Sequence, residues 1–445
     1  MTTSLLTDRY ELTMIEAALG SGRAERPCVF EVFARRLPAG RRFGVVAGQG
    51  RLLDALTEFP FDADDLAWLE REKVVGASTL RWLADYRFRG SISGYREGEV
   101  FLPGSPLLTI TGTFAEAVVL ETLVLSTLNY DSAVASAAAR MVAASDGRPL
   151  AEMGSRRTSE ASAVAAARAA HIAGFAASSN LEAGRRWGVP TMGTAAHSFT
   201  LLHDSEEAAF RAQVEALGTG TTLLVDTFDV ARGIETAVRV AGTDLGAVRL
   251  DSGDLPSLVR EVRAQLDGLG ATGTRITVTN DLDEHTIAAL RGAPVDSFGV
   301  GTSVVTGSGS PAAGFVYKLV AHRGDDEWQP VAKASPGKIS RGGTKRGERL
   351  IGADGRARAE HVIIDDTPDG EPDGGTSTSG AGSEVGASIR SLTVPLVVDG
   401  EVDARWRGPE GVQLARAHHA DAIAELPAEA MRLGDGDPAL PTVYK

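Results

Sequence analysis

A histidine and an arginine–aspartate pair stand out among the residues that could do chemistry. His197 lies in GTAAHSF, between small residues that let a ligand approach its imidazole, and histidine readily acts as a base or nucleophile near neutral pH. Arg249 and Asp251 lie in AVRLDSGD, and a strand would point both to one side, where the arginine could bind a carboxylate or phosphate and the aspartate a hydroxyl or metal. The pattern predicts a site for an anionic substrate, although a structural histidine and a plain salt bridge would look the same.

Further cations and a glycine turn extend this anion-binding pattern. Arg156 and Arg157 precede a helix-like run at 159–173, where guanidinium groups could meet a phosphate or form surface salt bridges. The segment Gly299 to Thr302 opens a glycine turn whose backbone N–H groups are unobstructed. Four of the chain's six lysines are close together in sequence, namely Lys318, Lys333, Lys338 and Lys345. This clustering favours contact with phosphate over a solvated basic loop.

The elements that must position these residues form a repeating series. Seven short apolar runs between Leu150 and Ser303 end in small, polar or charged residues, and most are separated by enough chain for a helix. Strands that alternate with helices predict a parallel βα architecture, with the chemistry where the strands end. The ends fall at 153–157, 177–180, 193–198, 226–227, 249–254, 279–281 and 299–303.

The flanking regions have a different texture. A capped helix over 7–20 and strands over 28–35, 90–96 and 107–113 predict a mixed α/β domain with an antiparallel-leaning sheet. We therefore expect an N-terminal α/β domain at 1–125, completed by C-terminal strands, and a catalytic α/β barrel at 126–315. The segment 316–445 would supply a phosphate-contacting loop and a flexible loop at 367–386, which carries almost no large apolar residue.

Composition excludes several classes of protein. The net charge of −14 argues against nonspecific nucleic-acid binding. No run of about 18 apolar residues could span a membrane, and the N-terminus lacks a secretory signal, so a cytoplasmic location is expected. The single cysteine, Cys28, excludes a disulfide framework and a cysteine-rich zinc site, and it is expected to be an ordinary partly buried thiol.

Taken in chain order, the motifs resemble those of the nicotinate phosphoribosyltransferase family. The likeness runs through LTDRYELTM, residues 152–180, GTAAHSF, LVDT, RLDSGDL, GVGTSVVT and YKL. It implies an α/β fold: an irregular seven-stranded α/β barrel of the type II phosphoribosyltransferases with an N-terminal mixed α/β domain. The implied reaction makes nicotinate mononucleotide and diphosphate from nicotinate and 5-phosphoribosyl 1-diphosphate for NAD biosynthesis. ATP hydrolysis would be coupled to it, and Mg²⁺ would be the cofactor.

The resemblance also implies roles for single residues. His197 would become a phosphohistidine, and Arg249 with Thr194 would hold the nicotinate carboxylate. The implied assembly is a homodimer with shared sites, in which Tyr10 of the partner subunit stacks on the pyridine ring. Met153 stands where many relatives have an aromatic side chain, and its polarisable sulfur could still cover the ring.

The remaining implied contacts are with ribose, phosphates and metal. Asp251 would bind the ribose hydroxyls or magnesium, the latter together with Asp254. Arg157 would face the phosphates. Other substrate contacts are expected at Ser198, Asn280, Gly299, Gly301 and Thr302, and contacts to ATP or diphosphate at Lys333, Lys338 and Lys345.

Several alternatives are weighed against this interpretation. A nicotinamide enzyme would favour an acidic residue where Ser178, Ser179 or Ser198 stands, and a quinolinate enzyme would need more cations. A catalytically silent relative would be expected to lack His197, Arg249 or Asp251. The Tyr10 motif argues against an unrelated phosphate-binding barrel, and the HVIIDDTPDG segment at 361–370 lacks the rest of the phosphoribosyl-diphosphate motif of the Rossmann-like transferases.

Overall fold

The computed structural model describes residues 2–325, 327–333, 340–365 and 386–445, which form two compact units. The first unit combines the chain up to Ser136 with the chain from Ser310 onward, and the second is Ala137–Gly309. The division falls between Ser136 and Ala137, inside helix α6 (Glu121–Ser145), whereas the sequence predicts the boundary between residues 125 and 126. The flexible loop expected at 367–386 lies outside the described residues apart from its last one, and so does the end of the HVIIDDTPDG segment.

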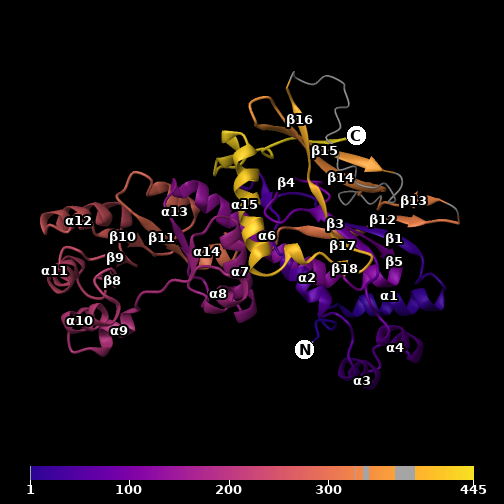
Figure 1. Cartoon of the computed structure of the whole chain (residues 1–445), viewed down its shortest axis with the longest axis horizontal. Helices are drawn as coiled ribbons and strands as arrows, with labels where there is room; N and C mark the ends of the chain where they lie inside the picture. The colour runs from indigo at the N-terminus through magenta and orange to yellow at the C-terminus, as the bar shows by residue number, and fades with distance from the viewer. Residues whose placement is uncertain (1, 326, 334–339, 366–385) are drawn as a thin grey trace. The chain divides into compact units, whose positions relative to one another are not determined.

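A seven-stranded antiparallel sheet forms the centre of the first unit (Figure 1). Its inner strand β1 is buried at every position from Cys28 to Ala34, because strands cover both its edges and helices pack on the sheet. The sheet draws strands from both ends of the chain. Its order is β13 (Trp328–Pro330), β12 (Phe315–Arg323), β1 (Pro27–Ala34), β5 (Leu108–Thr113), β3 (Ser91–Tyr95), β17 (Thr393–Val398) and β18 (Glu401–Val402).

Helix α1 (Arg9–Gly20) shows why the predicted helices form. Leu12, Ile15 and Ala18 make a buried apolar stripe at helical spacing, and Gly22 adopts a positive φ of 69° just after the helix ends. The other helices of the unit are α2 (Gln49–Thr57), α3 (Ala63–Arg71), α4 (Ala77–Ala84), α5 (Phe114–Val118), η1 (Ala404–Trp406), α15 (Gly408–Glu425) and η2 (Ala428–Met431). The smaller sheets are β16 (Ser388–Ser391), β14 (Thr344–Ile351), β15 (Ala357–Asp365), β19 (Thr442–Tyr444), and the pair β2 (Gly44–Val45) and β4 (Val100–Phe101).

The second unit contains a six-stranded parallel sheet, as the alternating pattern predicts. A parallel bridge between Ser178 and Thr191 adds a seventh position at the edge, so all seven apolar runs take part and the expected fold class is confirmed. The strand order is β7 (Ala177–Ser178), β6 (Leu150–Glu152), β11 (Ser297–Val300), β10 (Arg275–Val278), β9 (Ala247–Leu250) and β8 (Thr222–Leu224).

Helices follow most of these short strands. Figure 1 shows α10, α11 and α12 beside β8, β9 and β10, and these helices contact one another in chain order. The helices of the unit after α6 are α7 (Glu160–Ile172), α8 (Leu181–Trp187), α9 (His197–Leu202), α10 (Glu206–Leu217), α11 (Val230–Ala241), α12 (Leu255–Gly268), α13 (Glu284–Ala289) and α14 (Thr302–Val305).

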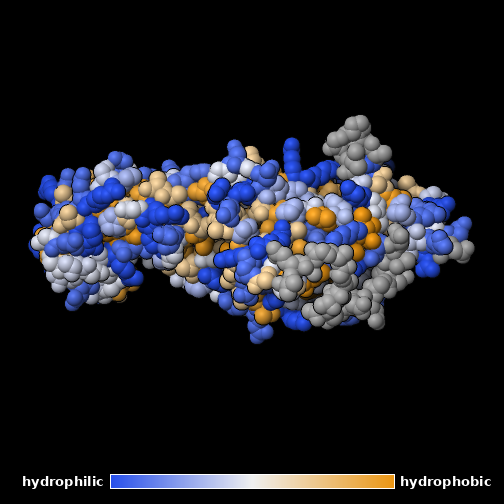
Figure 2. Space-filling view, turned by 90° about the horizontal axis from the view of Figure 1, so that it is seen from above, coloured by the Kyte–Doolittle hydropathy of each residue, from blue (hydrophilic) through white to orange (hydrophobic). Residues whose placement is uncertain are grey.

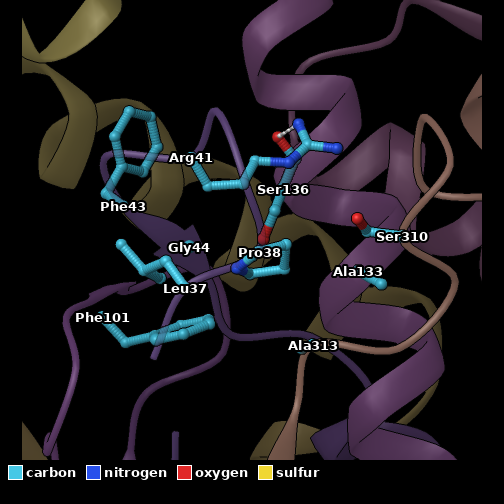
Figure 3. A pocket seen from close by; sticks show the side chains of 10 residues that line it. All are labelled: Leu37, Pro38, Arg41, Phe43, Gly44, Phe101, Ala133, Ser136, Ser310 and Ala313. Carbon is cyan, nitrogen blue, oxygen red and sulfur yellow. Dashed lines mark hydrogen bonds between the residues drawn. The ribbon is translucent and has the colours of Figure 1, made fainter. Parts of the chain in front are cut away.

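The surface and one interior gap complete the description. The face seen in Figure 2 is largely hydrophilic, with apolar patches between the charged side chains. Within the first unit, Arg41 reaches the Ser136 carbonyl oxygen at 3.4 Å beside a cavity of about 10 Å³ (Figure 3). That space holds about one water molecule, so it is no substrate site. None of the described helices has the length and apolar character needed to cross a lipid bilayer.

Candidate active site

The strand ends of the second unit bring His197 beside two aspartates. His197 is the first residue of α9 and its side chain is 41% exposed. Its Nε2 lies 3.8 Å from Asp251 Oδ2 and 4.0 Å from Asp226 Oδ1, while Nδ1 lies 3.1 Å from Thr227 Oγ1. The imidazole is therefore held at one nitrogen, and the other faces two carboxylates and solvent.

Asp226 holds the loop after β9 in place. Its side chain is 1% exposed, and Oδ2 accepts hydrogen bonds from the Asp251 backbone N–H at 2.8 Å and from Ser252 Oγ at 2.7 Å. Its Oδ1 is buried and has no hydrogen-bond partner in the described part of the chain. Sequence reasoning assigned no role to Asp226 or Thr227, although they directly follow an apolar run, the signal used elsewhere.

Arg249 lies in the same cluster, on β9. Its Nη1 donates to Thr194 Oγ1 at 2.9 Å and to the Ala195 carbonyl oxygen at 3.0 Å, and Nε donates to Thr279 Oγ1 at 3.0 Å. Nη2 lies 3.4 Å from Asp251 Oδ2, and the side chain is 14% exposed. The expected Arg–Asp pair is therefore present. Through Arg249, the ends of β9 and β10 are also connected to Thr194 and Ala195, which follow the bridge at Thr191.

Met153 packs over Gly299 beside this arginine. The Met153 backbone N–H donates to the Val300 carbonyl oxygen at 2.7 Å. A Cβ atom on Gly299 would lie 2.7 Å from Met153 Sδ and 2.7 Å from Thr279 Cγ2. Glycine is required here because only its bare Cα leaves room for the methionine and for Thr279, the threonine that binds Arg249. The thioether therefore lies over the same glycine as Thr279, the residue that accepts a hydrogen bond from Arg249.

A buried carboxylate shapes the neighbouring strand ends. Glu152 accepts hydrogen bonds from Ser178 Oγ at 2.6 Å and from the Gly154 backbone N–H. Burial raises the pKa of Glu152, and these two hydrogen bonds act in the opposite direction. Ser178 is thus engaged by Glu152 and by the Asn180 backbone N–H, at 2.9 Å. Sequence reasoning did not assign a role to Glu152, which ends a strand but is hidden from solvent.

The glycine turn and the arginines lie near the same strand ends. A Cβ on Gly154 would lie 2.9 Å from the Gly301 carbonyl oxygen and 2.2 Å from Val305 Cγ1, so the loop after β6 packs on the turn before α14. Thr302 in that turn is exposed, and so are Arg156 and Arg157. Neither arginine has an ion-pair partner among the described residues, which leaves both guanidinium groups open to solvent.

Other predicted residues occupy varied places. Asn280 is half-buried just after β10, and Ser198 is exposed on α9. Asp254 is exposed and accepts a hydrogen bond from Ser257 Oγ at 2.5 Å. In the first unit, Tyr10 is 45% exposed on α1, and burial together with Glu121 raises its pKa.

The lysines are a partial correction. Lys345 is buried, with Nζ 3.1 Å from Glu31 Oε2 and 2.8 Å from the Arg341 carbonyl oxygen, so it does not offer its ammonium group to a phosphate. The error arose because Lys345 lies in β14, and its sequence neighbours gave no sign that Glu31 would be packed against it. Lys333 is exposed, while Lys338 lies outside the described residues.

Comparisons with known proteins agree with one another. Two family models match: the nicotinate phosphoribosyltransferase (NAPRTase) N-terminal domain over residues 5–129 and the nicotinate phosphoribosyltransferase (NAPRTase) family over residues 149–350. Nicotinate phosphoribosyltransferase pncB1 of Mycobacterium tuberculosis H37Rv is 56% identical over 98% of this chain and 94% of its own length. The Bacillus subtilis nicotinate phosphoribosyltransferase is 37% identical over 78% of this chain and 73% of its own. A crystal structure of human nicotinic acid phosphoribosyltransferase, 26% identical, superposes with a TM-score of 0.81 over 99% of this chain and 97% of that one.

Proposed function

The chain belongs to the nicotinate phosphoribosyltransferase family, and from that membership we propose that it makes nicotinate mononucleotide from nicotinate and 5-phosphoribosyl 1-diphosphate, in NAD biosynthesis, with ATP hydrolysed through a phosphohistidine. The observation that carries the proposal is the clustering of His197, Arg249 and Asp251 at adjoining strand ends. A silent relative would lack at least one of the three.

Arg249 is the residue proposed to bind the nicotinate carboxylate. Three of its hydrogen bonds, to Thr194, Ala195 and Thr279, fix the plane of the guanidinium group. Nη2, whose acceptor Asp251 is 3.4 Å away, can still donate to a ligand. A charge-assisted hydrogen bond in a partly desolvated mouth favours an acid over its neutral amide, so nicotinate fits better than nicotinamide.

Transfer requires the pyridine nitrogen to attack the anomeric carbon while diphosphate leaves. Met153 would lie along the pyridine ring and Asp251 would accept hydrogen bonds from the ribose hydroxyls. Backbone N–H groups around Gly301 and Thr302 would bind the ribose phosphate. Arg157, exposed on the loop after β6 that packs on this turn, would face the phosphates. Positive charge develops on the ribose as negative charge grows on the diphosphate, so fixed anions and cations on the two sides lower the barrier.

The aspartates suit the hard cation that such chemistry needs. Asp226 Oδ1 is a buried carboxylate oxygen without a partner among the described residues, and Asp251 presents a second carboxylate near it. Mg²⁺ is commonly held by one or two carboxylates plus substrate phosphates, and no cluster of three or more protein ligands occurs in the residues described here. Asp226 with Asp251 would hold the ion better than Asp254, because the buried Asp226 Oδ1 is still without a partner among the described residues, whereas Asp254 is exposed. When bound, magnesium neutralises charge on the leaving diphosphate.

His197 is proposed to take the γ-phosphoryl group of ATP. With Nδ1–H donated to Thr227 Oγ1, Nε2 carries the lone pair for attack. The Nε2–P bond forms as the bond from the γ-phosphorus to the bridging oxygen breaks and ADP leaves. Water then attacks the phosphoramidate, releasing phosphate and restoring the imidazole. The exposure of the ring gives ATP access to it.

The test offers labelled 5-phosphoribosyl 1-diphosphate with nicotinate, nicotinamide and quinolinate in parallel, with and without ATP. We expect labelled nicotinate mononucleotide from the first base and little product from the others, with ATP raising the rate. Preferential use of nicotinamide or quinolinate would overturn the proposal.

A further inference from the structure

Two adjoining cavities in the first unit share a pair of arginines. One cavity, of about 320 Å³, lies between α1 and the sheet strands β1 and β12. The other, of about 310 Å³, lies beside the turn from Gly22 to Pro27 and the end of β12. Arg23 and Arg26 line both cavities, so they mark the place where the two meet. Neither arginine belongs to the catalytic set of the second unit.

The first cavity has apolar walls. Met14, Ala17 and Ala18 line it from α1, Phe114 lines it from α5, and Leu319 lines it from β12. Its size falls at the lower end of the range for small-molecule sites, which are commonly apolar with a few polar groups at one place. The cavity can therefore hold the apolar body of a small molecule.

The junction supplies cationic groups. Neither Arg23 nor Arg26 has an ion-pair partner in the part of the chain that the structure describes. Arg26 Nε donates to the Arg323 carbonyl oxygen at 2.6 Å, which orients its guanidinium group. His322 also lines the apolar cavity, and its Nδ1 is buried without a hydrogen-bond partner among the described residues.

Two carboxylates limit how much negative charge the junction accepts. Glu25 and Asp325 line the polar cavity but not the apolar one, and Glu25 Oε1 accepts a hydrogen bond from Trp82 Nε1 at 3.2 Å. Arg323 also lines the polar cavity, so a polyanion that extended into it would meet one further cation and two carboxylates. A single anionic group at the arginines would avoid them, with its carbon skeleton in the apolar cavity.

We propose that this junction is a second ligand site, which binds a small monocarboxylic acid with an apolar body. The carboxylate accepts hydrogen bonds from Arg23 and Arg26, and the body packs against Met14, Phe114 and Leu319. His322, which also lines the apolar cavity, offers a further polar contact.

Cys28 provides a built-in reporter of this site. It is the only cysteine of the chain and lines the apolar cavity, opposite His322 in the pairing of β1 and β12. Burial raises the pKa of its thiol to about 11, and the charge of Arg26 acts in the opposite direction. Arg26 and Cys28 line the same cavity, so the charge of Arg26 can influence reagents that approach the sulfur.

The experiment measures alkylation of Cys28 in the full-length protein at pH 9, each rate being divided by that of glutathione with the same reagent. We expect iodoacetate to be favoured over iodoacetamide by about fivefold, because the arginines attract the anionic reagent. 3-Phenylpropionate should slow both reactions saturably, while 3-phenylpropionamide should not. Arg26→Gln should lose the preference and the protection, and Arg71→Gln, on an exposed part of α3, should keep both.

Several outcomes would overturn the site. Equal protection by the acid and the amide would show a plain apolar crevice, and an unchanged preference in Arg26→Gln would remove the arginine from the account. Unaltered activity with nicotinate and an unaltered melting temperature establish that the variant is folded. If Arg26→Gln does not fold, calorimetric titration of the wild-type protein with 3-phenylpropionate decides, and absence of saturable binding contradicts the proposal.

Discussion

At the scale of single residues, the proposed selectivity depends on Arg249. Arg249→Ala removes the cation proposed to meet the carboxylate, so kcat/KM for nicotinate should fall while that for nicotinamide changes little. Loss of a charge-assisted hydrogen bond in such a site costs about 2–4 kcal/mol. Steady-state kinetics with both bases measure this directly. Arg275→Ala is the matched control, because Arg275 is exposed on the neighbouring strand β10. Wild-type kcat/KM for nicotinate in Arg249→Ala would refute the assignment.

The residue types at the strand ends are enough to predict which side chains share a site, but they do not show which of these side chains are buried. The motifs GTAAHSF and AVRLDSGD suffice to predict that His197, Arg249 and Asp251 share one site, because parallel strands end on the same side. Asp226 and Lys345 show what such motifs miss. The partners of Asp226 are Asp251 and Ser252, which lie on another strand end and are brought to it only by the fold. Lys345 is paired with Glu31, which lies on β1 opposite Lys318. Because Glu31 precedes Lys345 by more than three hundred residues, this pairing cannot be read from the local sequence.

At the scale of elements, strand β11 and the loop after β6 form the proposed pocket floor. Gly299→Ala would place a Cβ 2.7 Å from Met153 Sδ, so the thioether must move and the ring contact should loosen. We expect KM for nicotinate to rise about tenfold, the factor that corresponds to about 1.4 kcal/mol, with a smaller change in kcat. Gly292→Ala is the control, since a Cβ there meets no atom within 4 Å. Equal kinetics in the two variants would count against Met153 as part of the base site.

Helix α1 carries a buried carboxylate whose titration should affect stability. Burial raises the pKa of Glu11 to about 7 from 4.5, although hydrogen bonds from Thr122 and Thr7 act in the opposite direction. The folded state then binds a proton that the unfolded state has released, so the free energy of unfolding should fall as pH rises from about 4.5 to 7. Between pH 5 and 8 this loss should be smaller in Glu11→Gln by about 2 kcal/mol, as measured by urea unfolding.

The matched control for this measurement is Glu70→Gln, at an exposed position on α3. It should keep the wild-type pH dependence. An identical pH dependence in the wild type and in Glu11→Gln would show that Glu11 does not titrate in this range.

Elements were predictable where their periodicity was local. The helix expected at 7–20 and the strand expected at 28–35 differ from α1 and β1 by at most two residues at each end. The apolar run at 189–192, the third in chain order, forms only the bridge at Thr191. The partner strands of the antiparallel sheet could not be read locally, because β1 pairs with β12 almost three hundred residues later.

At the scale of the whole molecule, we propose a homodimer with shared sites. Three large apolar side chains near His197 are exposed: Leu201 and Leu202 on α9, and Phe228 next to Thr227. Exposed apolar groups gathered beside a polar site are typical of a surface that a partner covers. Tyr10, exposed on α1 of the first unit, is the residue proposed to act across this interface.

Subunit mixing tests this arrangement. Tyr10→Ala and His197→Ala proteins, each inactive in the ATP-coupled reaction alone, should regain activity when mixed. In a heterodimer one of the two sites would receive both an intact tyrosine and an intact histidine. Random exchange makes about half of the dimers heterodimers, so the recovered activity should reach at most about a quarter of the wild-type value. Verified subunit exchange without recovery would contradict a shared site. Tyr10→Phe should retain more activity than Tyr10→Ala, because it keeps the aromatic ring.

The measurement that tests the central claim most directly is transfer of label from γ-labelled ATP to the protein. We predict an acid-labile, alkali-stable adduct at His197, formed at a rate that supports nicotinate mononucleotide synthesis and lost in His197→Ala together with ATP hydrolysis. His203→Ala, whose imidazole bonds the Phe199 carbonyl oxygen, should label normally. Label that persists in His197→Ala, or maps to His171 or His203, would contradict the account.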